Sequence, residues 1–279
     1  MQPTATRRCL HARDSGRTGC VRGAGGRAFG AFDSPTPGFA TMKVSVIIPA
    51  YNEEQCLPET LERIGKALSV AARPSEIIVV DNDSRDGTKR VAEVFGAKVF
   101  PETEHNISKV RNTGAANSTG DVLIFIDADT LVPDTLFRKI AAAMDDEKCL
   151  GGAAAVEYED FERRWLRFYL RGWRFWGTVF NMKQGAAQFC RKPVFAEVGG
   201  YDQTIFMGED VEFYWRLSEF AGRNKGYLCF IEHPPVTTSA RRFDKMGLWK
   251  TLLLTHPLFI RLTWRRKSLW KDWYDKAVR

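Results

Sequence analysis

Two aspartates stand one residue apart directly after an apolar stretch of the chain. Asp127 and Asp129 follow Val122–Ile126, which has the length and composition of a buried strand. Hard divalent cations such as Mg²⁺ or Mn²⁺ prefer carboxylate oxygens as ligands, usually together with water and substrate phosphates. An ion held there would neutralise a diphosphate leaving group. Aspartate pairs are also frequent in ordinary strand-to-loop turns, so the pattern alone leaves both interpretations open.

A second acidic pair, Glu209 and Asp210, follows Gly208 and precedes a segment with helical spacing, Val211–Phe220. Acidic residues at a helix N-terminus stabilise the helix through its dipole, so capping is one interpretation of the pair. The other is general-base catalysis, in which a carboxylate removes the proton of an attacking hydroxyl within hydrogen-bond reach. In that case Asp210 is the candidate base, with Glu209 beside it.

A third polar cluster, Asp81-Asn82-Asp83, comes directly after the apolar run Ile77–Val80. Asp and Asn are common turn formers, so a simple loop that caps the next helix is one interpretation. The functional interpretation is recognition of the polar edge of a nucleoside.

Strands and helices must position these groups, and in the first half of the chain the two alternate. Strands are predicted at Val44–Ile48, Ile77–Val80, Ala97–Phe100 and Val122–Ile126, and helices at Leu57–Val70, Thr88–Phe95 and Ser108–Asn117. This alternation is typical of βαβ units and a mainly parallel sheet. Ligands bind such sheets beyond the carboxyl ends of the strands. We therefore expect the polar residues that follow three of these strands to lie at one edge.

Six motifs taken together resemble glycosyltransferase family 2. In chain order they are Val44–Glu54, Val80–Thr88, Arg111–Gly114, Gly120-Asp121, Asp127–Asp129 and Gly208–Asp210. Each motif is weak alone, but their order over roughly residues 43–220 is specific. The resemblance implies the GT-A fold, an α/β, mainly parallel Rossmann-like αβα sandwich with a smaller acceptor-binding C-terminal part. It also implies inverting transfer of a sugar from a nucleotide diphosphate sugar to an acceptor hydroxyl, with Mg²⁺ or Mn²⁺.

The resemblance also implies roles for individual residues. On the donor side, Pro49, Tyr51 and Glu53 would border the nucleoside, Asp81 and Asn82 would contact the base or ribose, and Arg111 would lie near the nucleotide. Asp127 would face the ribose and the metal, Asp129 would ligate the metal, and Asp210 with Glu209 would be the catalytic base. The family often has two aspartates where this chain has Asp81-Asn82. Uridine is the first candidate for the nucleoside of the donor.

Two further segments resemble parts of the family. Gly185–Tyr201 is similar to the acceptor-side loop, and Thr238–Phe243 is similar to a closing segment of some members. In the closing segment, Arg241 or Arg242 would contact the diphosphate or the acceptor. A surface salt bridge is the alternative role for these two arginines.

The net charge of +7 is concentrated at the start of the chain. Residues 1–41 contain six arginines and two aspartates and so carry +4, which leaves +3 on the rest. Because the chain after residue 41 has no concentrated basic face, no nucleic acid partner is expected. Residues 1–41 have no apolar periodicity and are expected to be a disordered leader. This leader is either a targeting extension or a stretch that precedes a true start at Met42.

The remaining chain is expected to form one catalytic domain and a tail. Residues 42–245 would be the GT-A domain, with a nucleotide-binding half at 42–150 and an acceptor half at 151–245. Residues 246–279 would be an amphipathic basic tail. No stretch of about 18 apolar residues is present, so no membrane-spanning helix is expected.

Two aromatic and basic segments, Tyr158–Phe180 and Leu248–Trp264, have open roles. Each would either pack into the core or lie on a membrane surface as an amphipathic segment. The protein is thus expected to be cytoplasmic and, in the second case, peripheral on the inner face of the membrane. Its acceptor would then be lipid-linked or part of a cell-envelope glycan.

Two other classes of function stay open at this stage. A nucleotidyltransferase would need a glycine-rich phosphate loop with a lysine near the first strand, and Pro49–Asn52 offers none. A non-catalytic sugar-binding module would be expected to lose the acidic pairs, yet all are present. Release of pyrophosphate would favour the first class, and donor binding without turnover the second. The six scattered cysteines lack zinc-site spacing.

Overall fold

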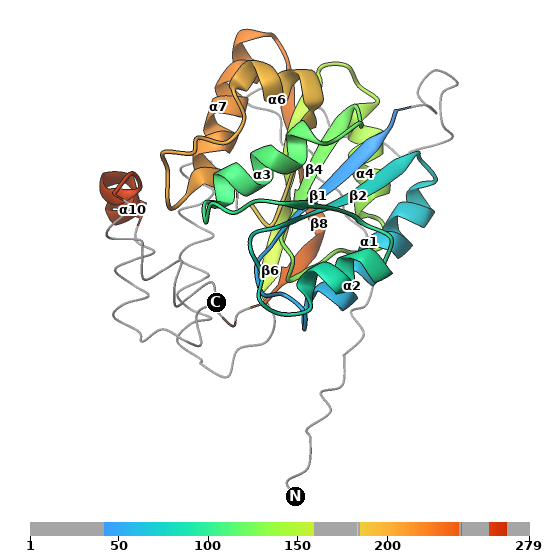
Figure 1. Ribbon diagram of the computed structural model, residues 1–279. Helices are drawn as coiled ribbons and strands as arrows, with labels where there is room; N and C mark the ends of the chain where they lie inside the picture. Colours follow the sequence, from blue (N-terminus) through green and yellow to red (C-terminus); the bar gives the residue numbers. More distant parts are fainter. Residues whose placement is uncertain (1–41, 159–182, 184, 240, 242–256, 267–279) are drawn as a thin grey trace, which may run out of the picture.

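The structure, a computed structural model, describes residues 42–158, 183, 185–239, 241 and 257–266 (Figure 1). The leader 1–41, all of Tyr158–Phe180 except its first residue, and most of the tail 246–279 lie outside the described residues. Their expected roles therefore stay predictions. Within the tail, Pro257 is the first residue of helix α10 (Pro257–Thr263), as suits a proline, whose missing N–H is not needed in the first turn of a helix.

One eight-stranded sheet runs through the described part of the chain, in the order β3-β2-β1-β4-β7-β6-β8-β5. Its strands are β1 (Val44–Ala50), β2 (Ser75–Asp81), β3 (Lys98–Pro101), β4 (Val122–Ile126), β5 (Thr130–Leu131), β6 (Cys149–Tyr158), β7 (Ala187–Arg191) and β8 (Tyr227–Thr238). The four strands expected from the sequence form the block β3-β2-β1-β4, and its three pairings are parallel.

The second half of the sheet is mixed. Strand β7 is antiparallel to both β4 and β6, and β5 is antiparallel to β8, whereas β6 and β8 are parallel. The antiparallel strands were not anticipated, because the sequence around them has no clear alternation of strand and helix signals. The predicted α/β class is confirmed, and the parallel pairings dominate in the half formed by β3, β2, β1 and β4.

Helices cover both faces of the sheet, as Figure 1 shows. Among the described residues, the helices besides α10 are α1 (Leu57–Ala71), α2 (Thr88–Val94), α3 (Ile107–Ala116), α4 (Leu136–Met144), α6 (Lys192–Val198) and α7 (Glu209–Arg223). Side chains of α1, α2 and α4 belong to one apolar core, and those of α3, α6 and α7 belong to a second. The molecule therefore has the three layers of an αβα sandwich.

Strand β1 shows how one strand serves both cores. Val46 and Ile48 lie in the core beneath α1, whereas Ile47 lies in the core beneath α3, and all three are fully buried. This follows from the alternation of side chains along a strand with both faces covered. A Cβ on Gly114 of α3 would come within 2.3 Å of the Ile47 side chain, so a glycine there lets α3 approach the sheet closely.

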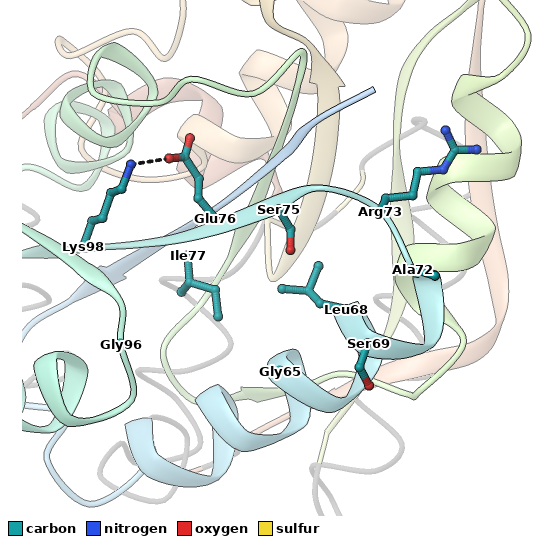
Figure 2. A pocket seen from close by; sticks show the side chains of 10 residues that line it. All are labelled: Gly65, Leu68, Ser69, Ala72, Arg73, Ser75, Glu76, Ile77, Gly96 and Lys98. Atoms are coloured by element: carbon teal, nitrogen blue, oxygen red, sulfur yellow. Dashed lines mark hydrogen bonds and ion pairs between the residues drawn. The ribbon is translucent and has the colours of Figure 1, made fainter. Parts of the chain in front are cut away.

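A groove of about 590 Å³ lies near the start of β2, between the C-terminal part of α1 and Gly96 (Figure 2). Its charged lining includes Glu76, which pairs with Lys98 at 2.7 Å. Glu76 also accepts hydrogen bonds from Ser45 and Thr119. Since β1 and β2 are parallel, this groove is at the opposite end of the strands from the acidic clusters. Glu76 serves the fold there.

None of the helices in the described part of the chain is both long and apolar enough to cross a membrane.

Candidate functional site

The carboxyl ends of β1, β2 and β4 form the edge where the polar clusters meet. Ala50 at the end of β1 is in register with Asp81 at the end of β2, and the Asn82 N–H donates to the Ala50 carbonyl at 2.8 Å. Strand β4 lies on the other side of β1 and is followed at once by Asp127. The expected convergence of the three polar stretches on one edge follows from these parallel pairings.

The turn after β4 directs both aspartates of the D-x-D motif away from the core. Ala128 between them is 4% exposed, and its carbonyl accepts a hydrogen bond from Thr60 Oγ1 at 2.8 Å. The Thr130 N–H closes the turn on the Asp127 carbonyl at 3.1 Å. The carboxylates of Asp127 and Asp129 are accordingly 32% and 17% exposed.

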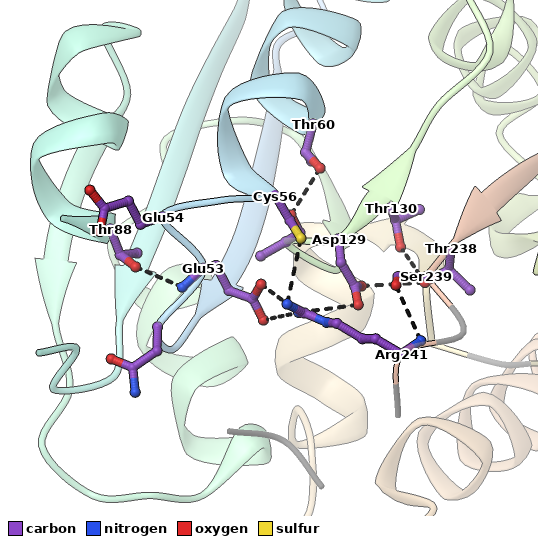
Figure 3. Close-up of polar contacts among 12 residues, drawn as sticks. Glu53, Glu54, Cys56, Thr60, Thr88, Asp129, Thr130, Thr238, Ser239 and Arg241 are labelled. Atoms are coloured by element: carbon purple, nitrogen blue, oxygen red, sulfur yellow. Dashed lines mark hydrogen bonds and ion pairs between the residues drawn. The ribbon is translucent and has the colours of Figure 1, made fainter. Parts of the chain in front are cut away.

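Asp129 belongs to a cluster that joins three distant parts of the chain (Figure 3). Arg241 Nη2 lies 3.3 Å from Asp129 Oδ2 and also donates to both carboxylate oxygens of Glu53. Thr238 Oγ1, at the end of β8, donates to Asp129 Oδ1 at 3.3 Å. Burial opposes the charge of Arg241, but pairing with Glu53 and Asp129 raises its pKa above the ordinary value. We call this group the Asp129 cluster.

Asp210 lies in the first turn of α7, after Gly208 with a φ of 77°. Its Oδ1 accepts the Val211 N–H at 2.8 Å, and its Oδ2 accepts the Gly185 N–H at 2.5 Å. Burial and the neighbouring charge of Glu209 raise the pKa of Asp210 to about 6, while Arg111 opposes the rise. A carboxyl with such a pKa suits proton transfer near neutral pH.

Arg111 of α3 connects carboxylates from two distant segments of the chain. Its Nη2 donates to Asp127 Oδ1 at 2.9 Å, and its Nη1 donates to Glu209 Oε1 at 2.7 Å. The guanidinium also lies 5.1 Å from the ring centre of Tyr201. Asp127 and Glu209 are 82 residues apart in sequence, yet one buried arginine binds both. We call Arg111, Asp127, Glu209 and Asp210 the Arg111 cluster.

Residues 45–199 of the chain match the family model described as "Glycosyl transferase family 2", which is more than half of the 279 residues. The chain belongs to glycosyltransferase family 2. The match contains Asp127 and Asp129 and ends before Glu209 and Asp210. The suspected family is confirmed.

The chain spans only part of the length of the curated relatives that it matches. Glycosyltransferase AglE of Haloferax volcanii is 27% identical over 208 residues, which cover 68% of this chain and 64% of AglE. The 4,4'-diaponeurosporenoate glycosyltransferase of Staphylococcus haemolyticus is 42% identical over 106 residues, 36% of this chain and 27% of that protein. A dolichol-phosphate mannosyltransferase of Pyrococcus furiosus is 38% identical over 108 residues, 37% of this chain and 30% of that enzyme.

Solved structures confirm the GT-A fold of this glycosyltransferase. TarS 1–349 of S. aureus superimposes with a TM-score of 0.56 at 18% identity and covers 73% of this chain and 62% of its own. The glucosyl-3-phosphoglycerate synthase of Mycobacterium tuberculosis, solved with Mn²⁺ and uridine diphosphate, gives 0.55 at 18% identity, with 80% and 84% covered. At such identities the likeness shows the fold alone.

The oxygen donors of Asp127 and Asp129 are of the kind that a divalent cation prefers. Asp127 and Asp129 offer partly exposed carboxylates on one turn, and the contacts of Asp129 with Thr238 and Arg241 are both long, at 3.3 Å. Within the described residues no group of three or more His, Cys, Asp or Glu side chains forms a complete protein cage. Mg²⁺ and Mn²⁺ do not need one, because substrate phosphates and water complete their coordination.

The residues that the sequence analysis assigned to the nucleoside lie together at the ends of β1 and β2. Pro49 is in β1, opposite Val80. The ring of Tyr51 meets that of His105 edge-to-face, with centres 5.1 Å apart. Asn82 is buried, and its Nδ2 donates to the carbonyls of Glu102 and Glu104 at 2.7 and 2.9 Å. Both amide protons of Asn82 thus hold the loop after β3.

His105 is one residue of this region that the sequence analysis did not identify, because its ring meets Tyr51 from a segment with no local signal. Gly185 and Thr238 begin the two segments that resemble parts of the family, but their contacts with Asp210 and Asp129 were not predicted. Arg241 is described and joins the Asp129 cluster, whereas Arg242 lies outside the described residues. The roles inferred for Pro49, Tyr51, Glu53, Asp81, Asn82, Arg111, Asp127, Asp129, Glu209 and Asp210 stay predictions.

Proposed function

We propose that this family 2 enzyme transfers a sugar from a nucleoside diphosphate sugar to an acceptor hydroxyl with inversion, using Asp210 as the general base. The observation that carries the proposal is the Arg111 cluster. There, Asp127 from the D-x-D turn and the Glu209-Asp210 pair from α7 share one arginine. Carboxylates that we assign to the donor and to the acceptor thus pair with the same guanidinium, which supports the proposal.

The donor would lie along the ends of β1, β2 and β4. Tyr51 and Asp81 would border the nucleoside, and the diphosphate would meet Asp127, Asp129 and Arg241. A divalent cation at Asp127 and Asp129 would supply positive charge against the diphosphate leaving group. Related folds have been solved with UDP-GlcNAc and with GDP-mannose and Mn²⁺. Uridine diphosphate sugars are our first candidates for the donor.

The transfer would be a single displacement. The acceptor oxygen attacks the anomeric carbon and forms the new glycosidic bond, while the bond from that carbon to the diphosphate oxygen breaks. The hydroxyl proton passes to Asp210, whose Oδ1 and Oδ2 are oriented by the N–H groups of Val211 and Gly185. The electron pair of the broken bond leaves with the nucleoside diphosphate. No covalent sugar intermediate is needed, so the anomeric configuration inverts.

The acceptor we propose is a hydroxyl of a lipid-linked molecule at a membrane surface. Relatives include transferases named for undecaprenyl phosphate and dolichol phosphate. Lipid binding would place the enzyme peripherally on the membrane. Flotation with liposomes that contain polyprenyl phosphate tests this part, because an enzyme that stays at the bottom of the gradient with and without the lipid has no such surface.

A donor screen tests the proposal as a whole. We expect Mn²⁺ with UDP-glucose, UDP-GlcNAc or GDP-mannose to raise the melting temperature, because a ligand that binds only the native state stabilises it. Asp129→Ala should lose most of this shift. Asp210→Asn should keep the shift yet reduce sugar transfer, or donor hydrolysis by water, by about 10²–10⁴-fold. Full turnover by Asp210→Asn would remove Asp210 from the role of base.

A further inference from the structure

The guanidinium of Arg111 is buried and bonded to protein carboxylates, so it is not exposed to donate to a ligand. Its side chain is 4% exposed. Nη1 and Nη2 are committed to Glu209 and Asp127. Nε is buried without an acceptor among the described residues. Burial opposes its charge, but Asp127, Glu209 and Asp210 together hold its pKa above the ordinary value. An arginine in this setting keeps its charge and its position.

The buried carboxylate of Glu209 depends on Arg111 for a balancing charge. Its side chain is 11% exposed and lies next to the candidate base in the first turn of α7. A buried, unpaired carboxylate would be costly and would repel the charge on Asp210. The 2.7 Å pair with Arg111 neutralises Glu209 and also ties the first turn of α7 to α3. The same guanidinium also pairs with Asp127, and it thereby connects α7 and α3 to the D-x-D turn.

Gly185 completes the support of Asp210 from the other side. Its N–H donates to Asp210 Oδ2. A Cβ at position 185 would come within 2.6 Å of Asp210 Cβ and 3.2 Å of Arg111 Nη2. The absence of a side chain therefore lets the backbone N–H reach the carboxylate while the guanidinium sits alongside. Both oxygens of Asp210 are thus fixed by backbone donors, with Arg111 packed next to Gly185.

We propose that Arg111 is a positioning residue for the base Asp210, which it serves through Glu209 and Asp127 rather than by contact with the nucleotide. This inference rests on the proposed function, because it needs Asp210 to be the base. It differs from the nucleotide-side role that the family resemblance implies for Arg111. It predicts that changes at Arg111 alter the rate at saturating donor and leave donor affinity nearly unchanged.

The test compares Arg111→Lys and Arg111→Met in the full chain. Lysine keeps the charge but cannot bridge two carboxylates with a planar fork. Methionine removes the charge, and if Met leaves the chain unfolded, Lys carries the test. We measure the Kd for UDP with Mn²⁺ by calorimetry and, for UDP-glucose, the kcat and KM of hydrolysis. Arg73→Lys is the matched control, because Arg73 also forms an arginine–carboxylate pair, with Asp145, on another part of the fold.

We expect Arg111→Lys to lower kcat about tenfold, since a misplaced catalytic group is costly, with the Kd for UDP within about twofold of the wild-type value. The control should match the wild type in both. A tenfold weaker UDP affinity with unchanged kcat would overturn the inference and make Arg111 a nucleotide contact. Asp210→Asn is run alongside. If it keeps full hydrolysis, the base assignment itself fails, which is a different outcome from failure at Arg111 alone.

Gly185→Ala offers a second perturbation that leaves all charges in place. The added methyl must displace Asp210 or Gly185 by some tenths of an ångström, because the atom it meets is the Asp210 Cβ, not the end of a flexible side chain. We expect lower kcat with unchanged UDP affinity. Gly222→Ala, also in the acceptor half and on the helix that contains Asp210, meets no atom within 4 Å and should behave as wild type. Equal kcat in the two alanine variants would argue against a fixed base.

Discussion

Arg241 Nη2 lies 3.3 Å from Asp129 Oδ2, so the carboxylate proposed to bind a divalent cation already contacts a guanidinium. The same nitrogen donates to Glu53, on the loop after β1. Two cations close to one carboxylate repel each other, and the repulsion is strong where water is partly excluded. The cation and Arg241 must therefore compete for Asp129 unless a diphosphate lies between them.

Arg241→Gln should affect metal and nucleotide binding in opposite directions. Without nucleotide, the variant should bind Mn²⁺ several-fold more tightly, because the competing positive charge is gone. With Mn²⁺ present, it should bind UDP about tenfold more weakly, because a charge-assisted contact to the diphosphate is lost. Calorimetry with each ligand measures both constants. Arg223→Gln, which changes an exposed arginine on α7, is the control. Weaker Mn²⁺ binding in Arg241→Gln would show that the guanidinium supports the metal site instead.

The raised pKa of Asp210 sets a pH dependence. The base works only as the carboxylate, and its pKa of about 6 means that protonation removes it as the pH falls through 6. Hydrolysis of UDP-glucose at saturating donor should be level above that point and fall about tenfold per pH unit well below it. Glu209→Gln removes a neighbouring negative charge, so it should move the midpoint to lower pH. If the midpoint on the acid side of the pH–rate profile were unchanged in Glu209→Gln, the charge of Glu209 would not be a cause of the raised pKa of Asp210.

The sequence predicted the parallel half of the sheet well, because each strand there is a short apolar run that ends in polar residues. Val122–Ile126 was predicted with the bounds that the structure gives β4, and Leu57–Val70 differs from α1 by one residue. Strands β6, β7 and β8 were not predicted. Strand β6 consists largely of glycine and alanine, and β8 contains two consecutive prolines, so neither has a normal strand composition.

The acidic residues of the candidate site were predicted from the sequence, but their ion pairs with Arg111 and Arg241 were not. Asp127 and Asp210 stand in motifs that local spacing reveals. The pair of Arg111 with Glu209, and the approach of Arg241 to Asp129, depend on tertiary contacts between segments about 100 residues apart. Such contacts have no local periodicity. The glycine at position 185 was visible in the sequence, but only the structure shows that a side chain there would meet Asp210.

Glu76 should make a pH-dependent contribution to stability that is separate from catalysis. Burial alone would raise its pKa, but bonds from Lys98, Ser45 and Thr119 lower it to about 2. The native state therefore holds its proton less tightly than the unfolded chain. The stabilisation is present above the unfolded pKa of about 4.5 and is lost as the pH falls towards 2.

Urea unfolding of Glu76→Gln measures this contribution. Since the side chain is only 6% exposed, we expect a loss of about 3 kcal/mol at pH 7. The difference from wild type should shrink at pH 3, where the folded protein can no longer gain as much from the charge. UDP affinity should not change, because Glu76 lies at the opposite end of the strands from the donor side. A loss of stability that is equal at both pH values would exclude the charge as its source.

Asn82 stands where the family often has a second aspartate, and its contacts explain why Asn82→Asp should be harmful here. Both protons of Nδ2 are donated to backbone carbonyls, those of Glu102 and Glu104. Asp would remove both donors and place a carboxylate against two carbonyl oxygens inside the protein. Leaving buried acceptors without donors should destabilise the fold by about 2–4 kcal/mol. Chemical denaturation measures this, with Asn117→Asp as the control, since Asn117 makes one exposed bond of the same type.

Because the loop after β3 carries His105, which lies against Tyr51, the Asn82→Asp variant should also bind UDP more weakly. If Asn82→Asp were as stable as wild type and bound UDP more tightly, Asn82 would face the nucleoside in solution and the structural role argued for its amide would be wrong.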